Sequence, residues 1–340
     1  MKYFRIVAPD LSIDLGTSHT IVARSDKGIV VQEPTVLALD YKKLEILALG
    51  QEAKEMLGKT PENIVAVRPL IGGVISDFDL TSAMLEYYIH KAIPGLSLLA
   101  PRVTISVPSG ATDVENRAIQ DACLQSGARD VFLVEESLAA AFGAGVLKND
   151  SQGVMIVNLG AGSSEVAVCS SYGVITSQNY KSAGDDVDKA IQDIIRDKYG
   201  LIIGSNTAEN LKKTIGSLRY DNQRNVMEIS GRDQVNGMPK SIDVVSSDIT
   251  EAIQPFVKDL VDTIHFTLEK TPPELSADIM KKGILMTGGS SLFDGLDGFL
   301  EEQLGIHVQL SKHPMEDTIL GTQMIMKNIK TFVKRESKND

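Results

Sequence analysis

The stretch that decides the fold is Leu11-Ser12-Ile13-Asp14-Leu15-Gly16-Thr17-Ser18-His19-Thr20-Ile21-Val22, which predicts an apolar strand, a glycine-centred turn rich in hydroxyl groups and a second strand. The stretch Met155-Ile156-Val157-Asn158-Leu159-Gly160-Ala161-Gly162-Ser163-Ser164-Glu165-Val166-Ala167-Val168 repeats this arrangement. Glycine lets a backbone approach a ligand closely, and such a turn points peptide N–H groups outward. Two hairpins of this kind, opening the two halves of the chain, predict a duplicated domain that grips a nucleotide phosphate tail from both sides.

Composition sets the broad class of protein. The chain has 340 residues, more than a single core usually organises, so we expect two domains or a bilobed body. An apolar fraction of 43% and a charged fraction of 23% are typical of a soluble globular protein. A net charge of −11 argues against nucleic acid as a partner, which needs a basic face. The only cysteines, Cys123 and Cys169, lie in apolar runs, which favours buried reduced thiols in the cytosol.

Short apolar runs alternate with helical patterns, which indicates an α/β architecture. Thr112 followed by Glu115 predicts a capping box at a helix start. The pattern predicts strands near 11–15, 20–25, 29–32, 35–39, 103–107 and 131–134, helices near 51–57, 80–92, 137–146, 186–199, 207–217, 247–269, 292–304 and 318–333, and a hairpin-like stretch over 225–245.

Asp14 ends the first apolar strand, immediately before the glycine turn. A carboxylate there can orient waters around a magnesium ion bound to phosphate oxygens, because Mg²⁺ prefers oxygen ligands and keeps several waters. The alternative is an Asp that satisfies turn amides. The presence of the second hairpin favours the magnesium role.

Glu136 lies just past the strand near 131–134, beside Glu135. One interpretation is that the two carboxylates complement a helix N-terminus. The other is that Glu136 positions or activates an attacking water, with Ser163 of the second turn holding the same water.

Two later motifs fit the nucleoside side of such a site. Asn206-Thr207-Ala208-Glu209 predicts a helix start with a capping box, and Glu209 and Lys212 then share a helix face. That pair is either a surface ion pair or a contact for a nucleoside. Thr287-Gly288-Gly289 follows a strand and precedes a helix, so its glycines either let a ribose or phosphate approach the backbone or form an ordinary turn.

Together these residues resemble the superfamily of actin, sugar kinases and heat-shock-chaperone ATPases, and more closely the MreB family of bacterial actin-like proteins. The resemblance runs from about residue 11 to about residue 322. It is carried by Ile13-Asp14-Leu15-Gly16-Thr17, Gly28-Ile29-Val30, Glu33-Pro34-Thr35-Val36, Val67-Arg68-Pro69-Leu70, Gly73-Val74-Ile75-Ser76-Asp77-Phe78-Asp79, Val107-Pro108-Ser109-Gly110, Glu135-Glu136-Ser137-Leu138-Ala139-Ala140-Ala141, Thr207-Ala208-Glu209-Asn210-Leu211-Lys212 and Glu269-Lys270-Thr271-Pro272-Pro273-Glu274-Leu275.

The resemblance implies an α/β, actin-like (ribonuclease-H-like) fold of duplicated domains, in which two lobes enclose a nucleotide cleft. The implied lobe I has a large subdomain of residues 1–32, 68–145 and 318–340 and a small one of residues 33–67. The implied lobe II has a large subdomain of residues 146–181 and 247–317 and a small one of residues 182–246.

The resemblance also implies ATP and Mg²⁺ as cofactors. Glu136 would align the hydrolytic water together with Ser163, and Asp14 would meet the metal through water. The implied nucleotide-binding residues are Asp14, Gly16, Thr17, Ser18, His19, Asn158, Gly160, Ala161, Gly162, Ser163, Gly184, Asp185, Glu209, Lys212, Gly288 and Gly289.

The chain departs from the family pattern inside the implied site. The family's second loop usually reads Asp-Ile-Gly-Gly-Gly-Thr-Thr-Glu, whereas this chain has Asn158, Ala161, Ser163 and Ser164. His19 stands where Asn is usual, Ser137 where Pro is usual, and Ala183 replaces the first Gly of a Gly-Gly-Asp. Losing a carboxylate at position 158 removes one charge from the magnesium environment, so we expect ATP binding with weak turnover.

The segment Pro94-Gly95-Leu96-Ser97-Leu98-Leu99-Ala100-Pro101 predicts an apolar loop. Exposed leucines need a cover, which is either a neighbouring helix or a bilayer. We favour shallow insertion of Leu96, Leu98 and Leu99, as the equivalent loop does in some proteins similar to MreB, with residues 2–6 as a second weak anchor. For the basic, amphipathic stretch 324–335, packing on the first lobe is the favoured role.

The resemblance thus predicts a filament-forming protein that assembles with itself, in single or paired protofilaments, for cell-shape or cytoskeletal work. We expect it in the cytoplasm, at the inner face of the cell membrane, with membrane lipid and membrane proteins of the cell-shape machinery as further partners. Two rivals remain: a scaffold that binds nucleotide without hydrolysing it, and a small-molecule kinase of the same superfamily.

Overall fold

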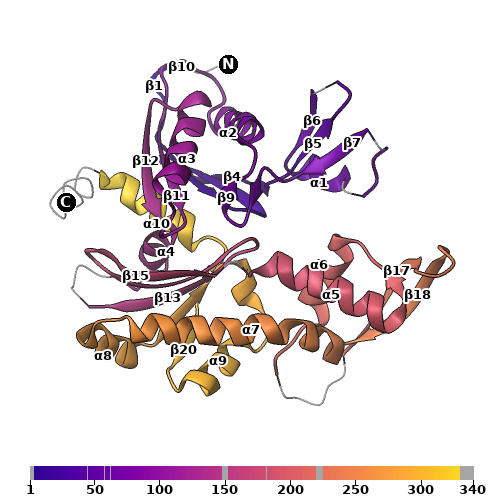
Figure 1. Cartoon of the computed structure of the whole chain (residues 1–340). Coiled ribbons are helices and arrows are strands. Elements are labelled where there is room, and N and C mark those ends of the chain that lie inside the picture. Colours follow the sequence, from indigo (N-terminus) through magenta and orange to yellow (C-terminus); the bar gives the residue numbers. More distant parts are fainter. Residues whose placement is uncertain are drawn as a thin grey trace.

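The structure is a computed structural model, and it describes residues 4–43, 45–56, 58–61, 63–147, 152–180, 182–219 and 225–329. Two bodies lie one above the other, each built on a five-stranded sheet, and each extends sideways into a smaller three-stranded sheet (Figure 1). We call the upper body of Figure 1 the first lobe and the lower body the second lobe. This bilobed α/β arrangement of two similar bodies agrees with the duplicated domains that the sequence predicted.

The two large sheets have the same strand order. The first lobe has the order β12-β11-β2-β3-β4, and the second has β20-β19-β13-β14-β15. In both, three consecutive strands form an antiparallel meander, and two later strands add in parallel beside its first strand. The strands are β2 (Leu11–Leu15), β3 (His19–Arg24), β4 (Gly28–Pro34), β11 (Arg102–Val107) and β12 (Asp130–Glu135), and then β13 (Val154–Leu159), β14 (Ser164–Ser170), β15 (Gly173–Tyr180), β19 (Ile284–Thr287) and β20 (Val308–Leu310).

Helices cover these sheets because the central strands are buried along their whole length. Every residue of β13 and β14 is buried, so their apolar side chains need cover on both faces. The predicted capping box of Thr112 and Glu115 is confirmed at the start of α3. The main covering helices are α2 (Phe78–Ala92) and α3 (Asp113–Gln125) of the first lobe, and α7 (Ser246–Glu269), α8 (Pro273–Lys282) and α9 (Leu296–Leu304) of the second.

The smaller sheets lie on the same side of the molecule, one in each lobe (Figure 1). The one in the first lobe consists of β5 (Leu37–Asp40), β6 (Glu45–Leu49) and β7 (Ile64–Val67), with α1 (Gln51–Met56). The one in the second lobe consists of β16 (Leu201–Ile202), β17 (Val226–Asp233) and β18 (Pro239–Val245), beside α5 (Gly184–Tyr199) and α6 (Ser205–Ile215). The subdomain boundaries stay predictions.

Helix α10 (Asp317–Lys327) returns the chain from the second lobe to the first, where it packs on α4 (Glu136–Gly143). A Cβ on Gly143 or on Gly321 would overlap the backbone of the other helix, so this close crossing requires glycine at both positions. Ile325 and Met326 are buried with residues of the first lobe, which confirms the predicted packing of this stretch. Residues 330–335 of the predicted amphipathic stretch lie outside the described residues.

Two predictions of helix starts were wrong. The capping box expected over 206–209 is absent: α6 begins at Ser205, and its N-cap, Gly204, has no side chain to offer. The helix expected near 292–304 is divided into a short 3₁₀ turn, η1 (Gly289–Leu292), and α9. The left-handed conformation of Gly295 separates the two, which a side chain at that position would disfavour.

The prediction of an apolar loop over 94–101 was also wrong, because Leu96–Leu99 form strand β10. This strand pairs in parallel with β1 (Phe4–Val7), at the end of the first lobe that is farthest from the second (Figure 1). A strand that pairs with a segment 92 positions away gives no local signal in the sequence, so the prolines on either side predicted a loop instead. Within the described residues, no helix combines the length and the apolar character needed to cross a membrane.

Candidate functional site

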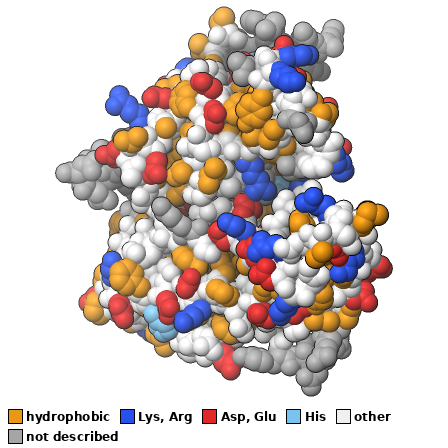
Figure 2. Space-filling model, turned by 45° about the vertical axis from the view of Figure 1, so that its right-hand side comes forward, with side chains coloured by type: hydrophobic (Ala, Val, Ile, Leu, Met, Phe, Trp, Pro, Cys, Tyr) orange, Lys and Arg blue, Asp and Glu red, His pale blue; other side chains and the backbone are white. Residues whose placement is uncertain are grey.

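A cavity of about 460 Å³ lies between the two lobes, within the usual range for small-molecule sites. Figure 2 shows acidic and basic side chains gathered where the two bodies meet. The structure brings every predicted catalytic and nucleotide-binding residue to the lining of this one cavity: Asp14, Gly16, Thr17, Ser18, His19, Glu136, Asn158, Gly160, Ala161, Gly162, Ser163, Gly184, Asp185, Glu209, Lys212, Gly288 and Gly289. Their individual roles stay predictions.

The turn between β2 and β3 is closed by a backbone hydrogen bond of its own, and it is held in place by Thr35, the residue that follows β4. The Gly16 N–H donates to the His19 carbonyl at 3.1 Å. Thr35 fixes the turn twice: its Oγ1 donates to the Gly16 carbonyl at 2.7 Å, and its N–H donates to the Ser18 carbonyl at 2.8 Å. These carbonyls are occupied, so the turn is held in one shape before any ligand arrives.

The turn between β13 and β14 has the same closure. The Gly160 N–H donates to the Ser163 carbonyl at 2.9 Å. Ser290 Oγ donates to the Gly160 carbonyl at 2.7 Å, as Thr35 does to Gly16 in the first lobe. A Cβ at Gly160 would lie 2.7 Å from the Ser163 carbonyl oxygen, so this tight turn requires glycine.

The two turns approach each other across the cavity. A Cβ on Gly162 would overlap the side chain of Thr17, so the second turn passes the first with no room for a side chain. The Gly73 N–H donates to Thr17 Oγ1 at 3.0 Å. Gly73 belongs to the turn between the short strands β8 (Leu70–Ile71) and β9 (Val74–Ile75), which therefore completes this wall.

Two half-buried carboxyl groups, those of Asp14 and Glu136, face the cavity between the turns. Burial raises the pKa of Asp14 to about 6, although Ser106 Oγ donates to its Oδ1 at 3.0 Å and opposes this rise. Burial also raises the pKa of Glu136 well above its usual value, and the charges of Asp14 and Glu165 add to that rise. Asn158 Nδ2 donates to Glu136 Oε2 at 3.4 Å.

Asp14 suits a metal ion that is coordinated mainly by phosphate oxygens and waters, with little help from the protein. Among the residues that the structure describes, no three His, Cys, Asp or Glu side chains form a group that could hold a metal ion. A magnesium ion bound by phosphate oxygens and waters does not need such a group, since one carboxylate nearby is sufficient to orient its waters. Asp14 lines the cavity and can supply that carboxylate.

The end of the cavity that was predicted to hold the nucleoside is lined by residues of α5 and α6. Lys212 Nζ lies 2.8 Å from Asp188 Oδ1 and donates to the Gly184 carbonyl at 2.7 Å. Glu209 pairs with Lys213 at 2.6 Å, so a surface pair of Glu209 with Lys212 is not what the structure has. Burial raises the pKa of Glu209, but the lysines around it, chiefly Lys213, outweigh burial and lower it.

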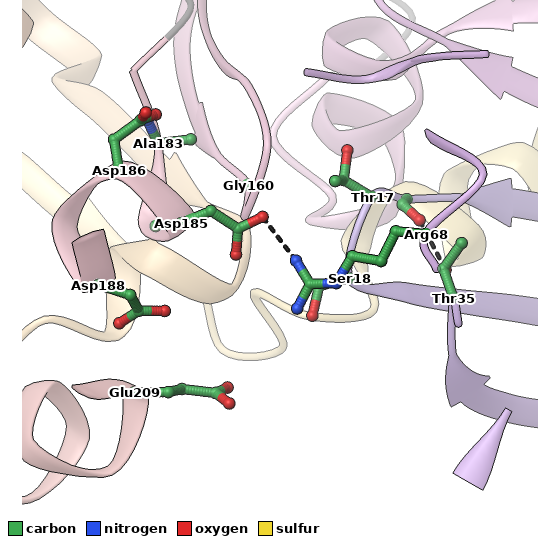
Figure 3. Close-up of polar contacts among 12 residues, drawn as sticks. Thr17, Ser18, Thr35, Arg68, Gly160, Ala183, Asp185, Asp186, Asp188 and Glu209 are labelled. Atoms are coloured by element: carbon green, nitrogen blue, oxygen red, sulfur yellow. Dashed lines mark hydrogen bonds and ion pairs between the residues drawn. The ribbon is translucent and has the colours of Figure 1, made fainter. Parts of the chain in front are cut away.

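Sequence reasoning missed an ion pair that crosses the cavity. Arg68, which precedes β8, meets Asp185 of the first turn of α5, with 2.7 Å between the guanidinium nitrogen and the carboxylate oxygen (Figure 3). The motif Val67-Arg68-Pro69-Leu70 contributed to the family resemblance, but it carried no sign of a partner 117 positions away. Asp188 and Ser290 were missed for the same reason.

Comparisons with known proteins agree with this geometry. Residues 8–334 match the MreB/Mbl protein family. The chain is 42% identical to the cell shape-determining protein Mbl of Bacillus cereus, over 96% of this chain and 98% of that protein. It is 41% identical to the cell shape-determining protein MreB of Escherichia coli K12, over 93% of this chain and 92% of that protein.

Solved structures give the same answer for the fold. Crystal structures of MreB5 of Spiroplasma citri bound to AMPPNP and to ADP both superpose with a TM-score of 0.90, at 34% identity, over 96% of this chain and 98% of that one. Family, sequence relatives and structural neighbours therefore agree, and the chain belongs to the MreB/Mbl family of actin-like proteins.

Proposed function

We propose that this chain binds ATP with Mg²⁺ in the cavity between the lobes. The observation that carries the proposal is that glycine turns from both lobes and Gly288–Gly289 line one cavity. A Cβ on Gly289 would meet nothing within 4 Å, so the backbone there is open to a ligand. Titration calorimetry of ATP with magnesium tests the proposal, and it fails if no adenine nucleotide is taken up.

The residues around the cavity suggest how hydrolysis proceeds. Magnesium, when bound, supplies positive charge that neutralises the phosphate oxygens. Asp14 orients waters of the metal, and the peptide N–H groups of both turns hold the phosphates. Glu136 Oε2 receives the Asn158 amide, so Oε1 is left to accept a hydrogen bond from the attacking water, which Ser163 also holds.

We expect weak turnover because Asn158 brings no charge to the metal environment. Its amide is instead a hydrogen-bond donor to Glu136. Phosphate release by the native chain and by Asn158→Asp tests this, and we expect the variant to be faster. A native rate that equals that of an MreB with an acidic residue at this position, and that does not change in the variant, contradicts the proposal.

We further propose that nucleotide-bound subunits stack end to end into filaments that serve cell shape or the cytoskeleton. The support is membership of a family whose relatives are named as cell shape-determining proteins. Sedimentation and electron microscopy with and without ATP test it. Filaments without phosphate release favour the non-hydrolysing scaffold, and soluble protein that phosphorylates a small molecule favours the kinase.

Finally, we propose that the filaments lie at the inner face of the cell membrane, where membrane proteins of the cell-shape machinery are further partners. The paired strands β1 and β10 leave Val7, Leu98 and Leu99 exposed, at 48%, 70% and 43% of their surface. Such an apolar edge suits shallow insertion into lipid.

Liposome sedimentation tests this membrane contact. We expect the triple variant of Leu96, Leu98 and Leu99 to Ser to stay in the supernatant. Val235→Ser is a matched control, because Val235 is also an exposed apolar residue but lies at the far tip of the β17–β18 hairpin. If the triple variant sediments as fully as the control, this strand is not the anchor.

A further inference from the structure

One buried carboxyl group lies beside the proposed hydrolytic residue and has no part in the mechanism above. Glu165 is on β14 of the second lobe and is only 3% exposed. In the sheet it lies opposite Asn158 of β13 on one side and Asn179 of β15 on the other. Its charge raises the pKa of Glu136, so the two carboxyl groups are electrostatic neighbours.

Glu165 makes its contacts with the other lobe. The backbone N–H of Ser109, in the turn after β11 of the first lobe, donates to Glu165 Oε2 at 3.3 Å. Asn179 Nδ2, from the next strand of the second lobe, donates to the Ser109 carbonyl at 2.6 Å. Two neighbouring strands of the second lobe thus bind both the backbone N–H and the backbone carbonyl of Ser109 in the first lobe.

The hydroxyl of Ser137 is a second polar group that acts on Glu165. Burial raises the pKa of Glu165 to about 7, while the hydroxyls of Ser109 and Ser137 face the carboxyl group and oppose this rise. Within the described residues, the Ser109 hydroxyl, the Ser137 hydroxyl and Glu165 Oε1 are buried, and none of the three has a hydrogen-bond partner elsewhere or at full hydrogen-bond geometry. Buried polar atoms of this kind are normally satisfied by one another, so we assign these hydroxyls to Glu165.

Ser137 directly follows Glu136, in the first turn of α4. In the family motif this position usually holds a proline, which has no hydroxyl to donate. With its hydroxyl assigned to Glu165, the serine of this chain gives the start of α4 a polar partner in the second lobe. Because Glu136 is the neighbouring residue, whatever fixes Ser137 also fixes the backbone from which the Glu136 side chain projects.

We propose that Glu165 is a positioning residue, which ties the first turn of α4 to the second lobe and so sets the place of Glu136 against the phosphates. The inference rests on the proposed ATP hydrolysis. Glu165 follows the second phosphate turn by two residues, so the strand that leaves this turn also carries the group that holds α4. Phosphate contact in the second lobe and water alignment from the first are thereby linked through one side chain.

Kinetics of phosphate release are the first test. We expect Glu165→Ala to lower kcat about tenfold, the scale of one hydrogen bond to a charged group, with KM for ATP within about twofold of native. Glu165→Gln keeps an acceptor for the Ser109 N–H and a donor for the serine hydroxyl, so we expect it to restore kcat to within about twofold. Asp278→Ala is the matched control, because Asp278 also accepts from a backbone N–H, that of Gly153, but lies on α8 and is not one of the charges that act on Glu136.

Hydrogen exchange of the nucleotide-free chain is a second test that needs no turnover. We expect Glu165→Ala to speed amide exchange over 136–140 and at Ser109 about tenfold, and Glu165→Gln to leave it within about twofold of native. Ser137→Ala is expected to speed exchange over 136–140 in the native background and to add little in Glu165→Ala, because both variants remove the same contact.

The outcomes separate this inference from the function on which it rests. If the native chain releases no more phosphate than Glu136→Ala, the proposed hydrolysis fails, and hydrogen exchange alone decides whether Glu165 holds α4. If the native chain hydrolyses ATP, the inference is overturned by an unchanged kcat in Glu165→Ala. It is also overturned if Glu165→Gln does not restore kcat, or if the effects of Ser137→Ala and Glu165→Ala on exchange simply add.

Discussion

The turn between β2 and β3 and the turn between β13 and β14 occupy equivalent places in two sheets of the same strand order. In the first, the Gly16 N–H reaches the His19 carbonyl at 3.1 Å, and in the second the Gly160 N–H reaches the Ser163 carbonyl at 2.9 Å. A Cβ on Gly16 or on Gly160 would lie 2.8 or 2.7 Å from the same carbonyl oxygens. The backbone of the two turns is therefore nearly the same in both lobes.

The side chains around the two turns differ in charge. Asp14 on β2 corresponds to Asn158 on β13, and Ile21, opposite Asp14, corresponds to Glu165, opposite Asn158. The first lobe thus places its carboxylate before the turn, whereas the second places an amide there and a buried carboxyl group after it. A glycine turn fixes the backbone locally, and the charges beside it can change independently. The proposed phosphate binding and the proposed hydrolysis can therefore vary separately in this fold.

The largest expected effect tests the difference between Ile21 of the first lobe and Glu165, which occupies the corresponding position in the second lobe. Burial raises the pKa of Glu165 to about 7, above its ordinary value of 4.5. The folded chain therefore keeps this proton to higher pH than the unfolded chain, and stability falls as pH rises between these two values. Over that interval we expect native protein to lose about 2–3 kcal/mol more than Glu165→Gln.

Urea unfolding of both proteins, measured without nucleotide at a series of pH values, checks this difference. Asp278→Asn is the control, because Asp278 is only half-buried and accepts only the Gly153 N–H in the described residues. If the free energies of unfolding of native protein and Glu165→Gln change in parallel with pH, Glu165 is ionised over the whole interval. The second lobe then has no protonated carboxyl group that distinguishes it from the first.

The next effect breaks the meeting of the two turns. A methyl group on Gly162 would overlap Thr17 and force the turns apart. Overpacking a tight contact costs ~1–3 kcal/mol, so we expect Gly162→Ala to weaken ATP binding about 10- to 100-fold. Gly298→Ala is the control, because a Cβ there meets nothing within 4 Å and the residue lies in α9, outside the cavity lining. Native affinity in Gly162→Ala would show that the turns do not enclose the phosphates together.

Local patterns explain how much of this site the sequence could predict. Each glycine turn is encoded in 12 to 14 consecutive residues, and the capping box of Thr112 and Glu115 in four, so all three were predicted where the structure has them. The residues around Glu136 and Gly288 were recognised through their place between a strand and a helix.

The features that sequence reasoning missed depend on contacts between distant segments. Glu165 lies in the strand that was predicted after the second turn, where no role was predicted for it, and its partner Ser109 is 56 positions away. Arg68 and Asp185 are 117 positions apart. Strand β10 looked like a loop because its partner β1 precedes it by 92 positions. None of these pairings leaves a periodic pattern, since each depends on how the lobes and strands come together.

A smaller effect tests whether the negative charge near the proposed magnesium ion must come from the first lobe, where Asp14 precedes the turn. Asp14→Asn removes the carboxylate that Ser106 orients, and we expect it to weaken binding of ATP with magnesium about tenfold, with little change for ADP without metal. The double variant Asp14→Asn with Asn158→Asp moves the charge to the second turn. It should not restore affinity, because position 158 faces Glu136 and not Ser106. Full recovery in the double variant would make the two turns interchangeable.

The smallest effect concerns the contact that crosses the cavity outside the turns. The ion pair of Arg68 with Asp185 joins the two lobes, but both side chains are more than a third exposed, at 39% and 38% (Figure 3). Exposed pairs contribute ~0.2–1 kcal/mol, so we expect Arg68→Ala to speed release of a fluorescent ATP analogue by no more than about fivefold. Arg129→Ala is the matched control, since Arg129 forms a similar exposed pair with Asp130 inside the first lobe.

If the Arg68 effect arises from this ion pair, it fades as salt screens exposed charges, and Asp185→Ala shows the same effect without adding to it. A loss of affinity beyond tenfold that persists in high salt would instead mean that Arg68 contacts the nucleotide directly. In that case the first lobe would hold the phosphates with a side-chain cation as well as with its glycine turn. The two lobes would then differ in how they bind ATP and not only in how they handle the attacking water.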